Sequence, residues 1–117
     1  MSAVDRPAGA PTPGQPVRGS RTGRPAMALL DLLGRRWALR VLWELREGPL
    51  AFRALQERCD GMSSSVLAQR LSELRGAGIV EQDEDGYRLS DQGAVLLESL
   101  GPLGDWAERW AERSRPA

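Results

Sequence analysis

The sequence of 117 residues contains no histidine, no lysine and one cysteine, Cys59. The absence of histidine excludes a Ser-His or Cys-His nucleophile pair within the chain, and it removes the usual nitrogen ligand of zinc. A single cysteine cannot form an internal disulfide. We therefore expect no catalytic residues, no metal site and no cofactor in this chain.

Long hydrophobic runs are also missing. No stretch of about 18 consecutive apolar residues, which a membrane-spanning helix requires, occurs in the sequence. The N-terminus lacks the apolar segment of a secretory signal. The length fits a single domain, and a hydrophobic share of 41% is enough for its core. We expect a cytoplasmic protein.

Charge is balanced overall but graded along the chain. All 16 basic residues are arginines, and they match 16 acidic residues. This balance argues against a broadly cationic surface. Residues 1–24 contain four Arg and one Asp, whereas residues 80–117 contain four Arg and nine acids. The acidic C-terminal third would suit a protein partner.

The first 24 residues are rich in proline, glycine and arginine and contain almost nothing apolar to bury. Such a composition is typical of disorder. We predict a disordered, solvated tail over residues 1–24, followed by one folded domain over residues 25–117. The alternative is a basic arm in which Arg18, Arg21 and Arg24 add phosphate contacts.

The middle of the chain predicts two helices joined by a tight turn. Ser63 or Ser64 can cap a helix over about 64–77, and its leucines recur at the spacing of one apolar face. A shorter helix over about 53–59 precedes it, and Asp60-Gly61 is a turn signal. Two helices in this order form a helix-turn-helix pattern.

The side of the 64–77 helix opposite its leucines is small and polar. We call it the polar face; it consists of Ser65, Ala68, Gln69, Ser72 and Gly76. Such a face lets a helix lie deep in a DNA major groove, where Ser and Gln can contact base edges. By itself it is equally compatible with an ordinary amphipathic helix.

The remaining pattern predicts a helical domain with a small hairpin. Asp83–Gly86 is a hairpin turn between strands near 79–82 and 87–89, and 50–52 is a candidate third strand. Further helices are predicted over 26–33, over 36–46 and after Ser90, which caps the last of them. A kink or break is expected at Gly101-Pro102. The 36–46 helix is apolar nearly all round, which predicts a central position. The fold class is therefore mainly α with a small β-hairpin: a winged helix-turn-helix with extra terminal helices.

This order of elements resembles the HxlR-type winged helix-turn-helix transcriptional regulators, relatives of the MarR family. The resemblance covers about residues 24–113 and rests on five segments taken together, namely residues 32–39, 48–55, 67–74, 78–80 and 87–93. It implies a dimeric DNA-binding repressor or activator whose N- and C-terminal helices form the dimer.

Three departures from the family pattern stand out. Many members carry a redox-sensing cysteine just before the first-helix proline, whereas this chain has Arg24, so that sensing mode should be absent. The wing is shorter than usual, and its Asp83-Glu84-Asp85 tip should repel phosphate. Ala51 stands where the family often has an arginine before the phenylalanine, and Arg53 follows Phe52 instead.

Candidate DNA contacts follow from the polar face and its flanks. Ser65, Gln69 and Ser72 are candidates for base edges. Ser64 and Arg75 suit phosphate, and Arg53 and Arg88 are further candidates for the DNA backbone. Arg70 lies nearer the leucines, and it either contacts phosphate or holds Glu73 in place.

Candidate dimer contacts lie at the two ends of the domain sequence. They are apolar residues that a core of this size need not absorb: Met27, Leu29, Leu30, Leu33, Leu100, Leu103, Trp106 and Trp110. The alternative is that both terminal helices fold back on their own domain. The four tryptophans are interpreted as core and dimer anchors, and Cys59 as a buried small residue.

We therefore expect a sequence-specific regulator that binds double-stranded DNA as a homodimer, and its effector, if any, stays unidentified. The main alternative is a winged-helix module that binds another protein and not specific DNA. An enzyme based on Asp83 and Asp85 is not favoured, because a turn cannot easily hold an acid and a base at different pKa values.

Overall fold

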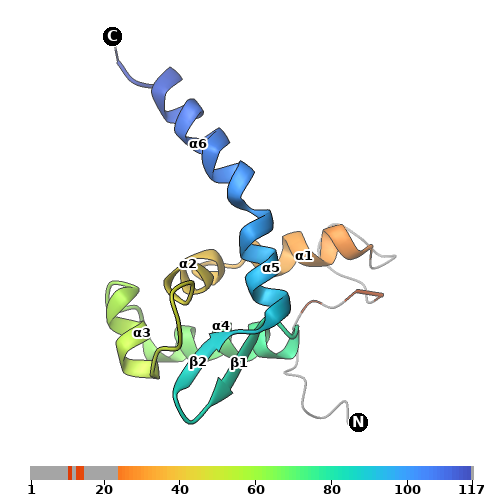
Figure 1. Ribbon diagram of the computed structural model, residues 1–117, viewed down its shortest axis with the longest axis vertical. Coiled ribbons are helices and arrows are strands. Elements are labelled where there is room, and N and C mark those ends of the chain that lie inside the picture. Colours follow the sequence, from red (N-terminus) through yellow and green to blue (C-terminus); the bar gives the residue numbers. More distant parts are fainter. Residues whose placement is uncertain (1–10, 12, 15–23, 117) are drawn as a thin grey trace.

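The computed structural model describes residues 11, 13–14 and 24–116. These residues form α1 (Pro25–Leu33), α2 (Ala38–Glu44), α3 (Phe52–Arg58), α4 (Ser64–Gly76), β1 (Val80–Asp83), β2 (Gly86–Leu89), α5 (Asp91–Ser99) and α6 (Gly101–Arg113). The hairpin and α4 lie at one end of the molecule, and α6 projects from the other end (Figure 1). The predicted class, mainly α with a small β-hairpin, is confirmed.

The core lies between α2, α3 and α4. Its fully buried leucines are Leu42, Leu45, Leu55, Leu67, Leu71 and Leu74. Each buried side chain of this kind contributes about 1.5–3 kcal/mol relative to an exposed one. Because three of the six belong to α4, that helix is fixed in place along its whole length.

The predicted signals at the ends of α4 are confirmed. The Ser63 hydroxyl accepts a hydrogen bond from the Val66 N–H, 3.1 Å away. At the other end Gly78 has a φ of 79°, and the Ile79 N–H donates to the Leu74 carbonyl at 2.9 Å. This closure is typical of a helix that ends before a left-handed glycine.

The turn between α3 and α4 follows the predicted Asp60-Gly61 signal. Both residues have positive φ angles, 59° and 69°. The Arg40 side chain of α2 bonds to the Arg58 carbonyl at 2.7 Å and to Asp60 Oδ2 at 3.2 Å. The helix-turn-helix is therefore held from the adjoining helix as well as by its own core.

The wing is a two-stranded antiparallel hairpin in which Val80 pairs with Leu89 and Asp83 pairs with Gly86. The predicted strand over 50–52 is reduced to one bridge, because Leu50 exchanges two 2.9 Å backbone hydrogen bonds with Tyr87, whereas Phe52 already begins α3. Glycine is required at position 86, since a Cβ there would collide with the Leu50 carbonyl.

The predicted helix over 36–46 is shorter than expected and only partly central. It begins at Ala38, because Trp37 has a φ of 77° and cannot belong to a continuous right-handed helix. Val41 and Leu42 are fully buried, but Leu39 and Trp43 are 44% and 51% exposed. One side of α2 therefore faces away from the core.

The predicted break at Gly101-Pro102 separates α5 from α6 at Leu100. No residue of α6 is buried. In the single chain α6 therefore buries no side chain, whereas α1, the other terminal helix, buries Ala28, Leu32 and Leu33. No helix among the described residues is long and apolar enough to cross a bilayer.

The predicted tail lies mostly outside the described residues. Of the positions that are described, Pro11 is buried, and Pro13 lies with it against α1 and α5, beside Leu29 and Leu96. At Pro11, therefore, the chain is not solvated as we expected.

Candidate nucleic-acid interface

The polar face of α4 is turned away from the core. Its leucines hold the opposite side of the helix, so Ser65, Ala68 and Gln69 are exposed, and Ser72 is half-buried. Ser64 is exposed at the start of the helix, where the Ser65 hydroxyl lies 3.3 Å from that of Ser63. The structure thus brings together all the small polar residues that the sequence suggested for base contact.

One acidic residue borders this face. Glu73 is 3% exposed, which makes it the least exposed charged residue among those that the structure describes. Arg35 Nη1 lies 2.6 Å from its Oε2, and Arg70 Nη1 lies 2.7 Å from its Oε1. Each carboxylate oxygen therefore has its own guanidinium. Glu73 presents no free negative charge to a polyanion.

Arg70 was expected either to contact phosphate or to hold Glu73, and the structure shows the contact with Glu73. Its side chain is 16% exposed and bonds both to Glu73 and, through Nε, to the Arg36 carbonyl at 2.7 Å. Arg70 thus holds Glu73 and ties α4 to the turn between α1 and α2. A polar hollow of about 330 Å³ lies beside these groups, and Gln69 and Arg36 also line it.

Other arginines around α4 are free of acidic partners within the described part of the chain. Arg75 and Arg53 are exposed and form no ion pair there, as the sequence interpretation requires of phosphate contacts. Arg36, which the sequence analysis missed, is likewise exposed and stacks 5.9 Å from the Trp37 ring. Only its place on the hollow beside Gln69 distinguishes it from other surface arginines.

Arg88 on the wing differs from Arg75 and Arg53 because it has acidic partners. It pairs with Asp83 and, at 3.3 Å, with Glu81. The side-chain hydrogen bond to Glu81 raises the pKa of Arg88, and the charge of Asp83 adds to the shift. The predicted backbone contact would have to compete with these two acids.

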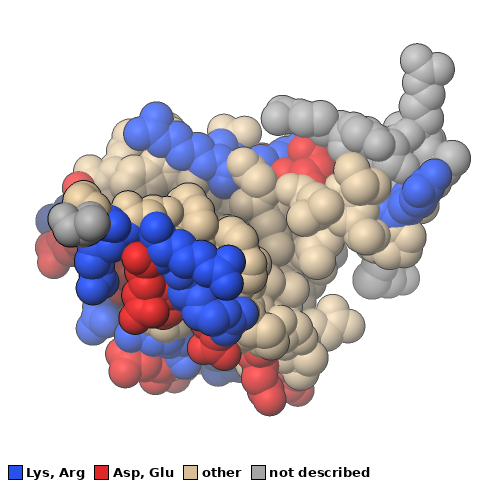
Figure 2. All heavy atoms as spheres, turned by 90° about the horizontal axis from the view of Figure 1, so that it is seen from above, with Lys and Arg blue, Asp and Glu red and all other residues tan. Residues whose placement is uncertain are grey.

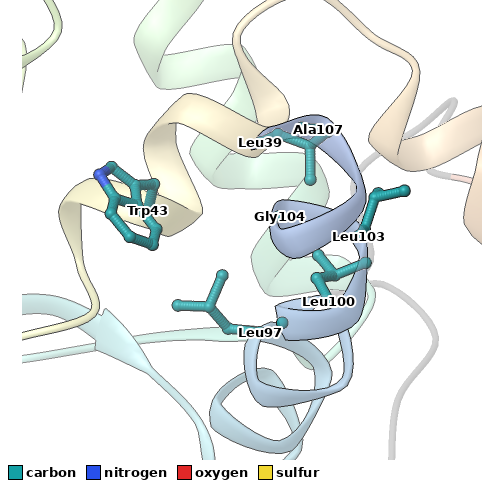
Figure 3. Close-up of a pocket in the computed structure, with 8 residues that line it drawn as sticks. Leu39, Trp43, Leu97, Leu100, Leu103, Gly104 and Ala107 are labelled. Atoms are coloured by element: carbon teal, nitrogen blue, oxygen red, sulfur yellow. The ribbon is translucent and has the colours of Figure 1, made fainter. Parts of the chain in front are cut away.

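The last helix carries an uncovered apolar stripe, defined as Leu100, Leu103, Trp106 and Trp110. Leu103, Trp106 and Trp110 are 58%, 53% and 58% exposed, and the two indole rings stack with centroids 5.8 Å apart. Beside the stripe is an apolar groove of about 480 Å³ between α2 and α6. Leu39 and Trp43 form one wall, and Leu97, Leu103 and Ala107 lie on the other (Figure 3).

The predicted dimer residues of α1 differ in their exposure. Leu30 is 60% exposed, whereas Met27 is half-buried. Leu29 packs against the core, and Leu33, which is 9% exposed, belongs to it. Leu33 is therefore not available to a partner. Of the four tryptophans only Trp37 packs on the core.

Charged side chains of both signs lie side by side on the end from which α6 projects (Figure 2). This agrees with the zero net charge and with the absence of a broadly cationic surface on this view. The buried position of Cys59 is confirmed, and burial raises the pKa of its thiol.

Comparison with known proteins places the chain in a family. Residues 32–115 match the family described as HxlR-like helix-turn-helix. The chain belongs to this family. Its relatives include YvaP of Bacillus subtilis, an HTH-type transcriptional regulator that is 30% identical over 73% of this chain and 85% of its own.

Solved structures agree with the family assignment. Quinone-bound YodB of Bacillus subtilis superposes with a TM-score of 0.68 at 32% identity, covering 73% of this chain and 98% of its own. A MarR-family transcriptional regulator of Enterococcus faecalis superposes with a TM-score of 0.67 at 25% identity, covering 81% and 96%. The chain is thus a winged helix-turn-helix, DNA-binding transcriptional regulator and not an enzyme.

Proposed function

We propose that this HxlR-like regulator binds duplex DNA sequence-specifically as a homodimer, in the cytoplasm, with α4 of each copy in the major groove. The observation that carries the proposal is the polar face of α4. Its residues are small or uncharged, and they are exposed except for the half-buried Ser72 and Gly76. Three fully buried leucines support the helix from behind. A helix of this kind can approach base edges closely without bringing a negative charge to the DNA.

Phosphate contacts would flank this face. Ser64 lies at the exposed start of α4, and Arg75 and Arg53 are exposed arginines without acidic partners in the described chain. Arg36 joins them from the turn between α1 and α2, beside Gln69. These contacts would fix the orientation of α4, whereas Ser65, Gln69 and Ser72 would supply the sequence preference.

The proposed dimer surface is the apolar stripe of α6 with the adjoining groove. An isolated helix of 13 residues is marginal in water, and α6 has no buried residue of its own to stabilise it. A second copy that covers Leu103, Trp106 and Trp110 would remove a large apolar patch from water, which is the usual meaning of such a patch. Exposed Leu30, Leu39 and Trp43 could extend the same surface.

Two variants on α4 test the DNA part of the proposal. Gln69→Ala should relax sequence preference and leave nonspecific binding nearly intact, since it removes a base contact only. Arg75→Ala should weaken binding to all sequences alike and lower the salt slope by about one unit, since it removes a phosphate contact. Both are measured by titration of a selected duplex and a random duplex over a range of salt.

Equal losses on both duplexes for Gln69→Ala would contradict base contact by α4. Wild-type protein that shows no salt-dependent DNA binding at all would instead favour the protein-binding alternative, in which the winged helix contacts another protein.

A further inference from the structure

The amide of the exposed Gln69 lies beside the buried carboxylate of Glu73. Its Nε2 donates toward Glu73 Oε2, 3.5 Å away and one helical turn further along α4. Glu73 is held in turn by Arg35 and Arg70, at 2.6 Å and 2.7 Å. Because Arg70 also bonds to the Arg36 carbonyl, the carboxylate that Gln69 meets is fixed to the body of the domain.

The orientation of the amide follows from charge. A flipped amide would place Gln69 Oε1 against the carboxylate oxygen of Glu73, and two acceptors without a proton between them repel. This repulsion favours the orientation in which the NH₂ group faces Glu73. One N–H of that group is used, and the second N–H and Oε1 remain for a base.

A fixed donor and a fixed acceptor side by side match one base in the major groove. Adenine offers an acceptor at N7 and a donor at N6, whereas guanine offers acceptors at both N7 and O6. With guanine, Oε1 of the amide would face O6 without a proton to share. An amide that could flip freely would lose this distinction more easily, and it would have to be ordered on binding.

We propose that Glu73 is a positioning residue, whose buried carboxylate orients the Gln69 amide so that α4 selects adenine over guanine at one position of each half-site. This inference rests on the proposed function, because it needs α4 to lie in the major groove.

The test compares binding to a set of duplexes. The best sequence selected by the wild type is altered to each of the four base pairs at every position in turn, and each duplex is titrated at one fixed salt concentration. Gln69→Ala identifies the position at issue, namely the one at which preference disappears. At that position the wild type should prefer adenine over guanine by roughly ten-fold or more.

Glu73→Gln then tests the positioning role, since it keeps the size of the side chain and removes the fixed carboxylate. We expect the adenine preference to fall to within about three-fold at the position sensitive to Gln69→Ala, with the other positions unchanged. Arg75→Ala is the matched control on the same helix, and it should lower affinity for every duplex while leaving the adenine preference intact.

Several outcomes would overturn the proposal. A folded Glu73→Gln protein that keeps the full adenine preference would show that Glu73 does not orient the amide. Should Glu73→Gln fail to fold, the wild type and Gln69→Ala decide, because Gln69 is exposed. A preference for guanine at the position they define would require the reversed amide. If the wild type binds no duplex, the proposed function itself fails. If the wild type binds specific sequences but does not select adenine at that position, only the inference about Glu73 fails.

Discussion

α4 and α6 have the same length, 13 residues each, and opposite surfaces. α4 buries its leucines completely and exposes serines and a glutamine, whereas α6 buries nothing and exposes Leu103, Trp106 and Trp110. The side chains that a helix exposes indicate which kind of surface can bind it. Small polar groups suit the base edges of DNA, and large apolar groups suit another protein surface. In the proposed function, the two ends of this domain would therefore bind different kinds of partner.

The largest effect on assembly and on specific DNA binding is expected from a charge placed on the apolar stripe. Trp106→Glu should weaken dimer association by about two orders of magnitude, as expected for an interface tryptophan, and should impair specific DNA binding with it. Folding should be unaffected, because Trp106 is 53% exposed in the single chain. Sedimentation and circular dichroism measure the two properties separately.

Val95→Glu is the matched control for this variant, since Val95 is a 61% exposed apolar residue of α5 outside the stripe. It should leave association unchanged. Unfolding of the Trp106→Glu protein would show that the stripe belongs to the core. A Trp106→Glu protein as dimeric as the wild type would show that the stripe is not the dimer surface.

The second prediction concerns folding stability and the buried ion pairs of Glu73 that hold α4 in place. Glu73→Ala should lower the free energy of unfolding by about 3–5 kcal/mol, because it leaves two partly buried guanidinium groups without their carboxylate. Urea denaturation measures this loss. Glu84→Ala at the exposed wing tip is the control, and it should change stability by less than about 0.5 kcal/mol. Equal stability of the two variants would show that the buried ion pairs do not stabilise α4.

A smaller effect is expected at the wing. Replacing Asp83, Glu84 and Asp85 by Asn should tighten DNA binding a few-fold, most at low salt, because surface charges are screened as salt rises. The change removes repulsion of phosphate and also frees Arg88 from Asp83. Weaker binding by this triple variant would mean that the acids take part in the complex.

The smallest effect is expected from oxidation. The reactive form of cysteine is the thiolate, and burial raises the pKa of the Cys59 thiol, so this form is disfavoured at neutral pH. Cys59 is also fully buried. Mild peroxide should therefore leave DNA binding unchanged. A reversible loss of binding that disappears in Cys59→Ser would contradict this expectation.

Features with local causes could be predicted from the sequence. The caps at Ser63 and Ser90 and the hairpin turn before Gly86 depend on a few adjacent residues. The leucine spacing of α4 also identified which of its faces would be exposed. Even the pairing of Arg70 with Glu73 was one of two alternatives, because these residues are three apart on one helix.

Features that depend on distant segments could not be predicted. Arg35 and Glu73 are 38 residues apart, so no local pattern indicated that they would meet. Leu39 and Trp43 were assigned to a central helix, but they are 44% and 51% exposed. They line a groove with residues of α6 that are distant in the sequence. Leu33 was assigned to the dimer surface, and the core that buries it involves residues from several other helices.

The central claim is that two copies of α4, related by a two-fold axis, recognise the DNA. Selection of bound duplexes from a random pool, at a stated salt concentration, tests it most directly. We expect inverted half-sites whose centres are about one helical turn, roughly 34 Å, apart. Enrichment of a single asymmetric site, or no enrichment by a protein that binds DNA, would contradict it.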